Sequence, residues 1–319
     1  MATSAAAKAF KGGGSSILAN PQDEAMGRIV EKIEALGLSE RLLELEVQGF
    51  TVIPSVLSED RIERAKAAIL RRAEKQAGHK IDPNSASASD FNGMQYQHYM
   101  IFDDPVFPEI LLEPKPLALV QYLLGESCVL SSMGSHFRGP GGLPLGVHVD
   151  GLPDGCMSSA AMIANCNYAL TPYSQEEGAL VLFPGSQHRL RQPMPKENWT
   201  AGGKTMLEIM AEQLSSVEID ELEWDLPAGG VTMNINPGDA VVWHGNSWHG
   251  GWRRELPGTR TNLAAYFCRD FMATQELRGD TRYQEVFERH ADDPNFAQLL
   301  GENNFNGWRD EGPDLSGVK

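Results

Sequence analysis

The chain has 319 residues, a formal net charge of −16, and 41% hydrophobic residues. This length permits one large domain or two small ones with a substantial core. The acidic surplus argues against a nucleic-acid partner, because such binding depends on phosphate neutralisation by lysine and arginine. The longest apolar runs fall short of the roughly 18 residues of a membrane span, so we expect no membrane partner.

The N-terminus and the cysteines bear on location. Residues 1–20 are rich in Ala, Gly and Ser and lack the apolar region of a secretory signal. We therefore predict a flexible arm over 1–20, followed by a single domain over 21–319. None of the four cysteines forms a Cys-x-x-Cys pair, and Cys166 and Cys268 lie in apolar runs where a reduced core thiol is expected. This usage favours a cytoplasmic protein.

The first part of the domain, 21–125, is predicted to form a helical flank. Apolar residues recur at helical spacing over 22–46, and Gly37 is a candidate break. Ser58 is a typical N-cap for a second helix that should end near Gly78. The pattern further predicts a strand over 48–54, a polar loop over 81–93 and a third helix over 116–124. A loop over 81–99 is expected to help set substrate choice.

Strands dominate the next part, about 126–270. The predicted strands cover 128–137, 146–150, 158–169, 178–183, 230–236, 240–244 and 261–268. Many strands with Gly/Pro turns, beside helices gathered at the N-terminus, predict a mainly β fold with flanking helices, of the α+β class. We expect the core to be a jelly-roll barrel, a double-stranded β-helix.

Two further segments accompany this core. The insertion 188–227 is interpreted either as a lid or as a helical cover over the barrel, with a helix over 205–214. The C-terminal tail, 271–319, is expected to pack on the helical flank or on a partner subunit.

The segment 146–151 carries the most informative motif, His148-Val149-Asp150. Side chains two positions apart on a strand point to the same side, so one imidazole and one carboxylate can reach a single point. With one more histidine this becomes the two-histidine, one-carboxylate set that suits non-haem Fe(II) and leaves coordination positions open. Alone, the motif is a weak signal.

A third ligand is offered about a hundred residues later. A Pro-Gly-Asp turn at 237–239 leads into the apolar run 240–243, and two histidines follow, His244 and His249. His249 precedes a Gly-Gly pair that allows close approach of the backbone. His244 is alternatively a packed or hydrogen-bonded histidine beside the site.

Arg260 stands eleven residues beyond His249 and opens a predicted strand. A guanidinium binds a carboxylate through two parallel hydrogen bonds, and a dicarboxylate cosubstrate such as 2-oxoglutarate needs such an anchor at its far end. Arg253 and Arg254 are nearer to His249 in the sequence and remain alternatives in a predicted loop.

With these pieces in this order, the chain resembles the phytanoyl-CoA dioxygenase family of Fe(II)/2-oxoglutarate-dependent oxygenases. Segment 177–188 is similar to the family's stretch of an acidic residue or Asn, Gly, an apolar strand and Pro-Gly-Ser-His, here with an extra Gln before the His. Segment 238–250 is similar to the strand leading to the family's distal ligand, and 48–60 is similar to its opening strand and helix. The resemblance extends from about residue 43 to 270.

The resemblance implies roles for particular residues. His148, Asp150 and His249 become the ligands of Fe(II), and Arg260 becomes the anchor of the distal carboxylate of 2-oxoglutarate. Asn167 matches a position whose side chain lies against the cosubstrate. His98 aligns loosely with another such position, and Gln97 competes with it for that role.

The implied activity is oxidation, most simply hydroxylation, of an unactivated C–H bond, with O2 consumed and succinate and CO2 released. The Met and Trp residues of the loops suggest a small, largely apolar substrate. Two alternatives stay open: a cupin-type metal oxygenase that uses no 2-oxoglutarate, and a non-catalytic barrel that binds a ligand. A homo-oligomer is compatible with the sequence.

Overall fold

The fold is given by a computed structural model that describes residues 21–88, 90, 93–150, 157–276, 281–290, 292–301, 308–309 and 312–313. The predicted arm over 1–20 and Cys156 lie outside these residues. The α-helices in the described part are α2 (Pro21–Ala35), α3 (Ser39–Gln48), α4 (Glu59–Ala77), α5 (Val106–Leu111), α6 (Pro114–Leu124), α7 (Met206–Ala211), α8 (Ser216–Asp220), α9 (Thr281–Arg289) and α10 (Pro294–Leu299). Short 3-10 turns are η1 (Met100–Phe102), η2 (Ser186–His188) and η3 (Pro195–Glu197).

Two antiparallel sheets form the centre of the protein. The six-stranded sheet has the order β1-β11-β5-β13-β3-β2, from strands β1 (Phe50–Ile53), β11 (Ala240–His244), β5 (Ile163–Ala169), β13 (Asn262–Cys268), β3 (Val129–Arg138) and β2 (Met94–Gln97). The four-stranded sheet has the order β10-β6-β12-β4, from β10 (Val231–Thr232), β6 (Leu180–Leu182), β12 (His249–Gly251) and β4 (Leu145–His148). Two facing sheets of this kind confirm the predicted jelly-roll class.

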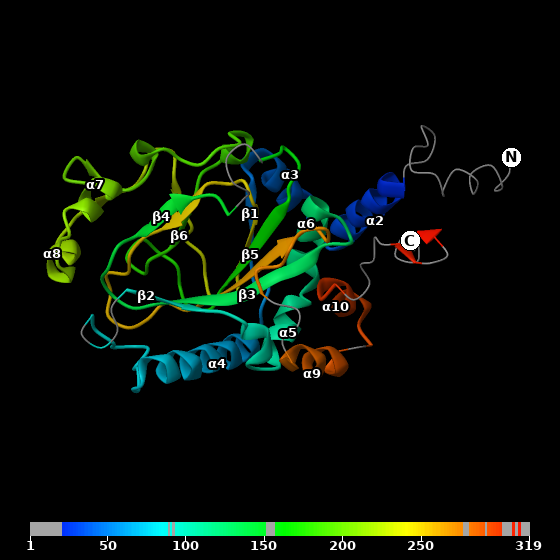
Figure 1. Ribbon diagram of the computed structural model, residues 1–319, viewed down its shortest axis with the longest axis horizontal. Helices are drawn as coiled ribbons and strands as arrows, with labels where there is room; N and C mark the ends of the chain where they lie inside the picture. Colours follow the sequence, from blue (N-terminus) through cyan, green and yellow to red (C-terminus); the bar gives the residue numbers. More distant parts are fainter. Residues whose placement is uncertain are drawn as a thin grey trace, which may run out of the picture.

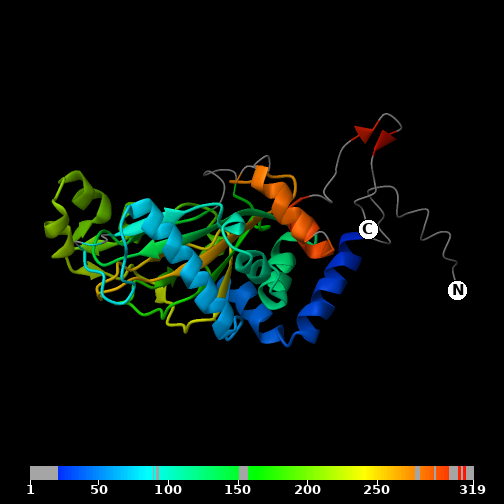
Figure 2. The same cartoon turned by 90° about the horizontal axis from the view of Figure 1, so that it is seen from below.

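The layers of the molecule follow from which sheet face is covered. Helices α4, α5 and α6 lie on one face of the large sheet, and the small sheet lies on the other (Figures 1 and 2). One apolar cluster joins the helices to the large sheet, and a second joins the large sheet, the small sheet and the insertion 188–227. Alternation along each strand divides the residues between these two clusters. On β11, for example, Val242 packs toward the helices while Val241 and Trp243 pack between the sheets.

Most predicted elements are present with small shifts. The expected helix over 22–46 is split at Gly37, whose φ of 68° is in the left-handed region, and the helix capped by Ser58 ends at Gly78 as predicted. The sequence prediction missed β2 and placed it in the loop over 81–99. Met94–Gln97 forms a strand because it pairs with β3. The strands predicted over 158–169 and 230–236 are shorter than expected, beginning at Ile163 in the first case and covering two residues in the second.

The insertion 188–227 and the tail pack against the core. Within the insertion, β7 (Thr200–Ala201), β8 (Lys204–Thr205) and β9 (Trp224–Asp225) form a small three-stranded sheet, beside α7 and α8. The side chains of Trp199 and Trp224 are buried in the second apolar cluster. In the tail, α9 contacts η1 of the predicted helical flank, which agrees with the expectation, whereas α10 contacts β3 of the large sheet. The short strands β14 (Trp308–Arg309) and β15 (Gly312–Pro313) pair with each other.

Other described features bear on the environment of the protein. No helix in the described ranges is both long and apolar enough to cross a membrane. Cys128, Cys166 and Cys268 are buried, and burial raises the pKa of the Cys128 and Cys166 thiols to about 12. Such thiols stay protonated at neutral pH and are poor nucleophiles.

Gly49 ends α3 and connects the helical flank to the loop that leads to His249. Its φ is +84°, its N–H donates to Leu45 O at 2.9 Å, and its carbonyl accepts from Ser247 Oγ at 2.9 Å. A Cβ at this position would collide with the Gln187 side chain and lie 2.6 Å from Ser247 Oγ. Gly78 ends α4 with nearly the same φ, +77°, but its Cβ would face open space.

This pair allows a matched stability test. Gly78→Ala should lower the free energy of unfolding by about 1–2 kcal/mol, the cost of a left-handed residue with a Cβ. Gly49→Ala should cost roughly 1–3 kcal/mol more, because the added methyl group overpacks a buried site. Urea unfolding of both variants measures the difference, and equal losses would contradict the close approach at Gly49.

Candidate metal centre and active site

His148, Asp150 and His249 converge at one end of the space between the two sheets. The Nε2 atoms of His148 and His249 each lie 3.3 Å from a different oxygen of Asp150. The two imidazole ring centroids are 4.2 Å apart, and one ligand atom from each residue lies within 4.8 Å of the others. Within the described residues this is the one group of three or more His, Cys, Asp or Glu side chains with metal-binding geometry.

Strand pairing brings the two histidines together. His249 in β12 lies directly opposite His148 in β4, so their side chains share one face of the small sheet. The strands approach closely because Gly250 follows His249: a Cβ there would lie 2.7 Å from Leu145 O. This agrees with the sequence expectation that the Gly-Gly pair permits close backbone approach. Asp150 follows two residues after His148, just beyond the end of β4.

Hydrogen bonds fix the orientation of both rings. Nδ1 of His148 lies 2.8 Å from Gly146 O, and Nδ1 of His249 lies 3.1 Å from Ser247 O. Each Nδ1 therefore carries a proton and donates it to a carbonyl, which leaves Nε2 as the nitrogen that can bind a metal beside Asp150. Ligands at about 2.1 Å from one ion and at right angles to each other are about 3.0 Å apart. The 3.3 Å separations fit such an arrangement.

The Asp150 carboxylate is held in its charged form. Burial acts to raise the pKa of Asp150, but the two imidazoles outweigh burial and hold that pKa well below its usual range. Asn165 Nδ2 also donates to Asp150 Oδ2 at 2.9 Å, so the carboxylate has a fixed orientation. An ionised carboxylate beside two imidazole Nε2 atoms is a donor set that suits a divalent transition metal such as Fe(II), because each Nε2 can bind the metal once it has lost its proton.

The outer edge of β4 is completed by two amide side chains of the insertion. Asn198 accepts from Val147 N and donates to Val147 O, both at 3.0 Å. Gln192 accepts from Val149 N at 3.1 Å and donates to Val149 O at 3.2 Å. β4 is the last strand of its sheet, so these amides replace the missing neighbour strand on both sides of His148. The insertion therefore supports the metal centre from outside the cavity.

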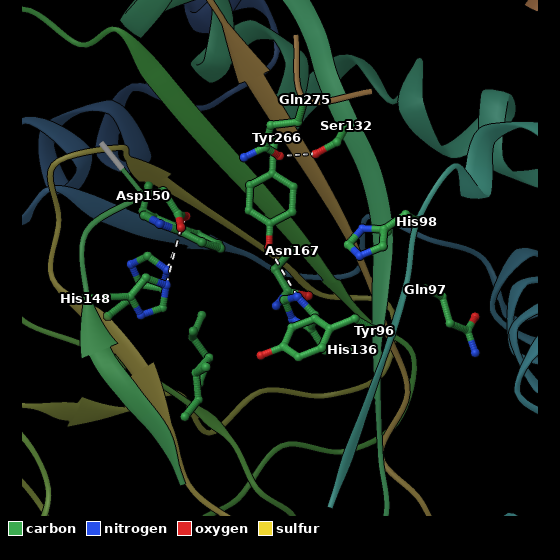
Figure 3. Close-up of a pocket in the computed structure, with 15 residues that line it drawn as sticks. Tyr96, Gln97, His98, Ser132, His136, His148, Asp150, Asn167, Tyr266 and Gln275 are labelled. Atoms are coloured by element: carbon green, nitrogen blue, oxygen red, sulfur yellow. Dashed lines mark hydrogen bonds and ion pairs between the residues drawn. The ribbon is translucent and has the colours of Figure 1, made fainter. Parts of the chain in front are cut away.

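A cavity of about 230 Å³ opens beside the triad. Figure 3 shows His148 and Asp150 on one side of it and Tyr266, His98 and Gln275 on the other. The small sheet and β11 contribute apolar groups, from Leu145, Leu180 and Trp243. The opposite wall is polar and is formed by Tyr96, His98, Ser132, His136, Tyr266 and Gln275.

Sequence comparison agrees with this geometry. The family model described as "Phytanoyl-CoA dioxygenase (PhyH)" matches residues 45–261, which is more than half of the chain. The chain belongs to the phytanoyl-CoA dioxygenase family. The resemblance inferred from the motifs is thus confirmed.

A relative in Aspergillus fumigatus, "Dioxygenase af480", is 26% identical to this family member over 224 residues. The match covers 67% of the present chain and 61% of that relative, so it spans less than two thirds of the relative's length.

Solved structures share the fold. HygX from Streptomyces hygroscopicus, in a structure with nickel and 2-oxoglutarate bound, has a TM-score of 0.52 and 18% identity, and covers 74% of this chain and 88% of its own. SnoK, a non-heme alpha ketoglutarate dependent carbocyclase from nogalamycin biosynthesis, has a TM-score of 0.51 and 20% identity, with 77% and 90% covered. At these identities the likeness establishes the fold.

The three candidates for cosubstrate contact, Asn167, His98 and Gln97, differ in where their side chains lie. Asn167 lines the cavity, and its Oδ1 accepts from Asn262 Nδ2 at 3.0 Å, which leaves its own amide N–H groups for a ligand. His98 points into the cavity in Figure 3, with its ring stacked on Tyr96 at a centroid distance of 6.5 Å. The Gln97 amide points away from the cavity and donates to Ile69 O in α4 at 3.2 Å.

Arg260 lies directly behind the cavity wall. Its side chain is buried, donates to Gly178 O at 2.6 Å, and reaches the carbonyl of the cavity residue His136. Arg253 donates to Ile219 O in the insertion, and Arg254 pairs with Glu177. Of these three arginines, Arg260 is therefore the one bonded to a residue of the cavity wall.

His244 and His136 are two further buried histidines, neither of them in the candidate ligand set. His244 is buried next to β5, and its Nδ1 accepts from Asn246 N at 3.0 Å, which agrees with the packed-histidine alternative. Burial lowers the pKa of His244 to about 4 and, together with Arg260, lowers that of His136 to about 3. Both rings are therefore neutral near pH 7.

Sequence reasoning missed Asn165, His136, Tyr266 and Gln275 as site residues.

The amide clamp on β4 can be tested through metal affinity. Asn198→Ala removes both hydrogen bonds to Val147 and should loosen the strand that carries His148, lowering Mn(II) affinity about tenfold, as is typical of residues that support metal ligands. Calorimetric titration with Mn(II) measures the change. Ser215→Ala is the control, because it removes the cap of α8 in the same insertion without touching β4. Equal affinities in the two variants would show that β4 does not depend on Asn198.

Proposed function

We propose that this protein is an Fe(II)- and 2-oxoglutarate-dependent oxygenase that oxidises, most simply hydroxylates, a C–H bond of a small molecule. This proposal rests on the convergence of His148 Nε2, His249 Nε2 and the Asp150 carboxylate at one point beside a cavity. Three protein ligands on one side of an ion leave its other positions open toward that cavity.

Each residue around the centre has a proposed task. His148, Asp150 and His249 hold Fe(II), and Asn165 keeps the carboxylate turned toward it. Asn167 contributes amide N–H groups to the cosubstrate, His98 borders the cavity as a further contact, and Arg260 anchors the distal carboxylate of 2-oxoglutarate. Gln97 keeps only the indirect role of fixing β2 against α4.

With Fe(II), 2-oxoglutarate and O2 bound, the site would supply the oxidising power, and 2-oxoglutarate would be converted to succinate and CO2. The protein has the complementary tasks of holding the reacting C–H bond near the metal and excluding water. Trp243 suits the second task, because its ring lies 5.3 Å from that of His249 and its side chain is buried.

The cavity wall also informs the substrate. The expectation of a largely apolar substrate came partly from Trp199 and Trp224, and both are core residues rather than cavity residues. We therefore propose an amphipathic small molecule. Its reacting carbon would lie toward Leu145, Leu180 and Trp243, and its oxygen-containing groups would face the polar wall.

Gln275 is the clearest specificity residue on that wall. Its Oε1 accepts from Ser132 Oγ at 2.6 Å and its backbone N–H donates to Ser131 Oγ at 3.1 Å, so its amide N–H groups are left to face the cavity. Substrates found by substrate-stimulated succinate formation should contain a hydrogen-bond acceptor.

For such substrates, Gln275→Leu should raise KM about three- to tenfold, the usual loss of one neutral hydrogen bond. Gln284→Leu, on the exposed face of α9, is the control and should leave KM unchanged. An unchanged KM in Gln275→Leu would remove this residue from the substrate site.

The central test compares wild type with Asp150→Ala. Anaerobic addition of Fe(II) and 2-oxoglutarate to the wild type should produce a weak visible charge-transfer band, and aerobic turnover should yield succinate. Asp150→Ala removes the carboxylate ligand and should lose the band and at least about 100-fold of the succinate rate.

The same experiment decides between the alternative functions. Metal binding without a band or succinate in the wild type would favour a cupin-type oxygenase that uses no keto acid. Absence of both metal binding and turnover would favour a non-catalytic barrel. Full activity in Asp150→Ala would contradict the ligand assignment.

The cysteines and the net charge bear on the cellular location and the partners of the protein. The cytoplasm remains the predicted location, since three buried thiols and an Fe(II) site both suit a reducing compartment. A small-molecule substrate is the proposed partner. The net charge of −16 supports the prediction that nucleic acid is not one.

A further inference from the structure

Arg138 and Arg260 face each other across two strands of the large sheet. Arg138 N donates to Arg260 O at 3.0 Å, and Arg260 N donates to Arg138 O at 2.7 Å. Residues that exchange both hydrogen bonds in an antiparallel pair place their side chains on the same face. Alternation along β3 makes this the face of His136, Gly134 and Ser132, which line the cavity.

These two cations are buried without a counter-charge. Arg138 is 2% exposed and Arg260 5% exposed, and neither forms an ion pair with an acidic side chain among the described residues. Among the described residues, the Arg138 guanidinium donates to Leu143 O and Met94 Sδ, and the Nε atoms of both arginines are buried without a hydrogen-bond partner there. By contrast, the buried Arg254 pairs with Glu177.

This arrangement is unfavourable unless an anion is present. Like charges directly opposite each other destabilise a sheet, and buried charges in proteins are normally paired. Burial and the neighbouring Arg260 lower the pKa of Arg138 to about 9, which reflects the same conflict. The surplus of two positive charges lies beside a cavity whose proposed cosubstrate carries two carboxylates.

We propose that Arg138 is a second anion-binding residue of the cosubstrate site and acts with Arg260 on the distal carboxylate of 2-oxoglutarate. This inference rests on the proposed function and extends it to a residue outside the metal centre. A carboxylate has enough lone pairs to accept from two guanidinium groups. It would relieve the repulsion between Arg138 and Arg260 and give their unpaired donors a partner.

The test compares two keto acids on the full-length protein loaded with Mn(II), by calorimetry. 2-Oxoglutarate has the distal carboxylate, and 2-oxovalerate has the same chain length without it. Arg138→Met should weaken 2-oxoglutarate binding about tenfold or more, the loss expected for a charge-assisted hydrogen bond, and leave 2-oxovalerate binding unchanged. Arg138→Lys keeps the charge and should lose less.

Arg269→Met is the matched control. Arg269 follows β13 and, like Arg138, donates to backbone carbonyls, those of Ala161 and Leu123, but it lies at the other end of the strand. Its loss should leave 2-oxoglutarate binding unchanged. Combining Arg138→Met with Arg260→Met should cost less than the two single losses together, because both arginines would act on one carboxylate.

Three outcomes separate the possibilities. Unchanged 2-oxoglutarate affinity in Arg138→Met would overturn the proposal, and so would an equal loss for both keto acids, which indicates a general structural role. Wild-type protein that binds neither keto acid would instead contradict the proposed function. If Arg138→Met does not fold, Arg138→Lys and Arg138→Gln carry the same comparison.

Discussion

The pairing of β4 with β12 is the constraint on which the functional site depends. It places His148 opposite His249, and the alternation of a strand then brings Asp150 to the same side two residues later. Strand β4 is short and lies at the edge of its sheet, so pairing on one side alone would hold it weakly. The amides of Asn198 and Gln192 satisfy its other edge. A segment that the sequence suggested as a lid is therefore also part of the scaffold of the metal centre.

Two buried side chains near the cavity carry a charge opposite in sign to the net charge of the protein. The chain carries a net charge of −16, yet Arg138 and Arg260 are buried behind the cavity wall and form no ion pair with an acidic residue in the described part of the chain. Among the residues that line the cavity, Asp150 is the one carboxylate. A ligand that binds both groups would bridge a site for a cation and a site for an anion. A keto diacid has this shape and charge, with chelating oxygens at one end and a carboxylate at the other.

Much of the fold could be predicted from the sequence because it is encoded locally. The caps at Ser58 and Gly78, the break at Gly37 and the apolar run of β11 are all local signals, and each lies where it was expected. Strand β2 was missed because Met94–Gln97 lacks a strong pattern of its own and is ordered by its partner β3. The same division applies to the site. The metal ligands belong to recognisable motifs, whereas Asn165, His136, Tyr266 and Gln275 become site residues only through sheet register and the path of the tail. Alternation along β3 and β13 was the one signal that could have suggested His136 and Tyr266.

Anomalous scattering of Mn(II) in crystals of the full chain, grown without oxygen, would locate the metal directly. We expect one strong peak bonded to the Nε2 atoms of His148 and His249 and to an oxygen of Asp150, with the remaining positions facing the cavity. A peak elsewhere, or a peak here with His249 beyond bonding distance, would contradict it.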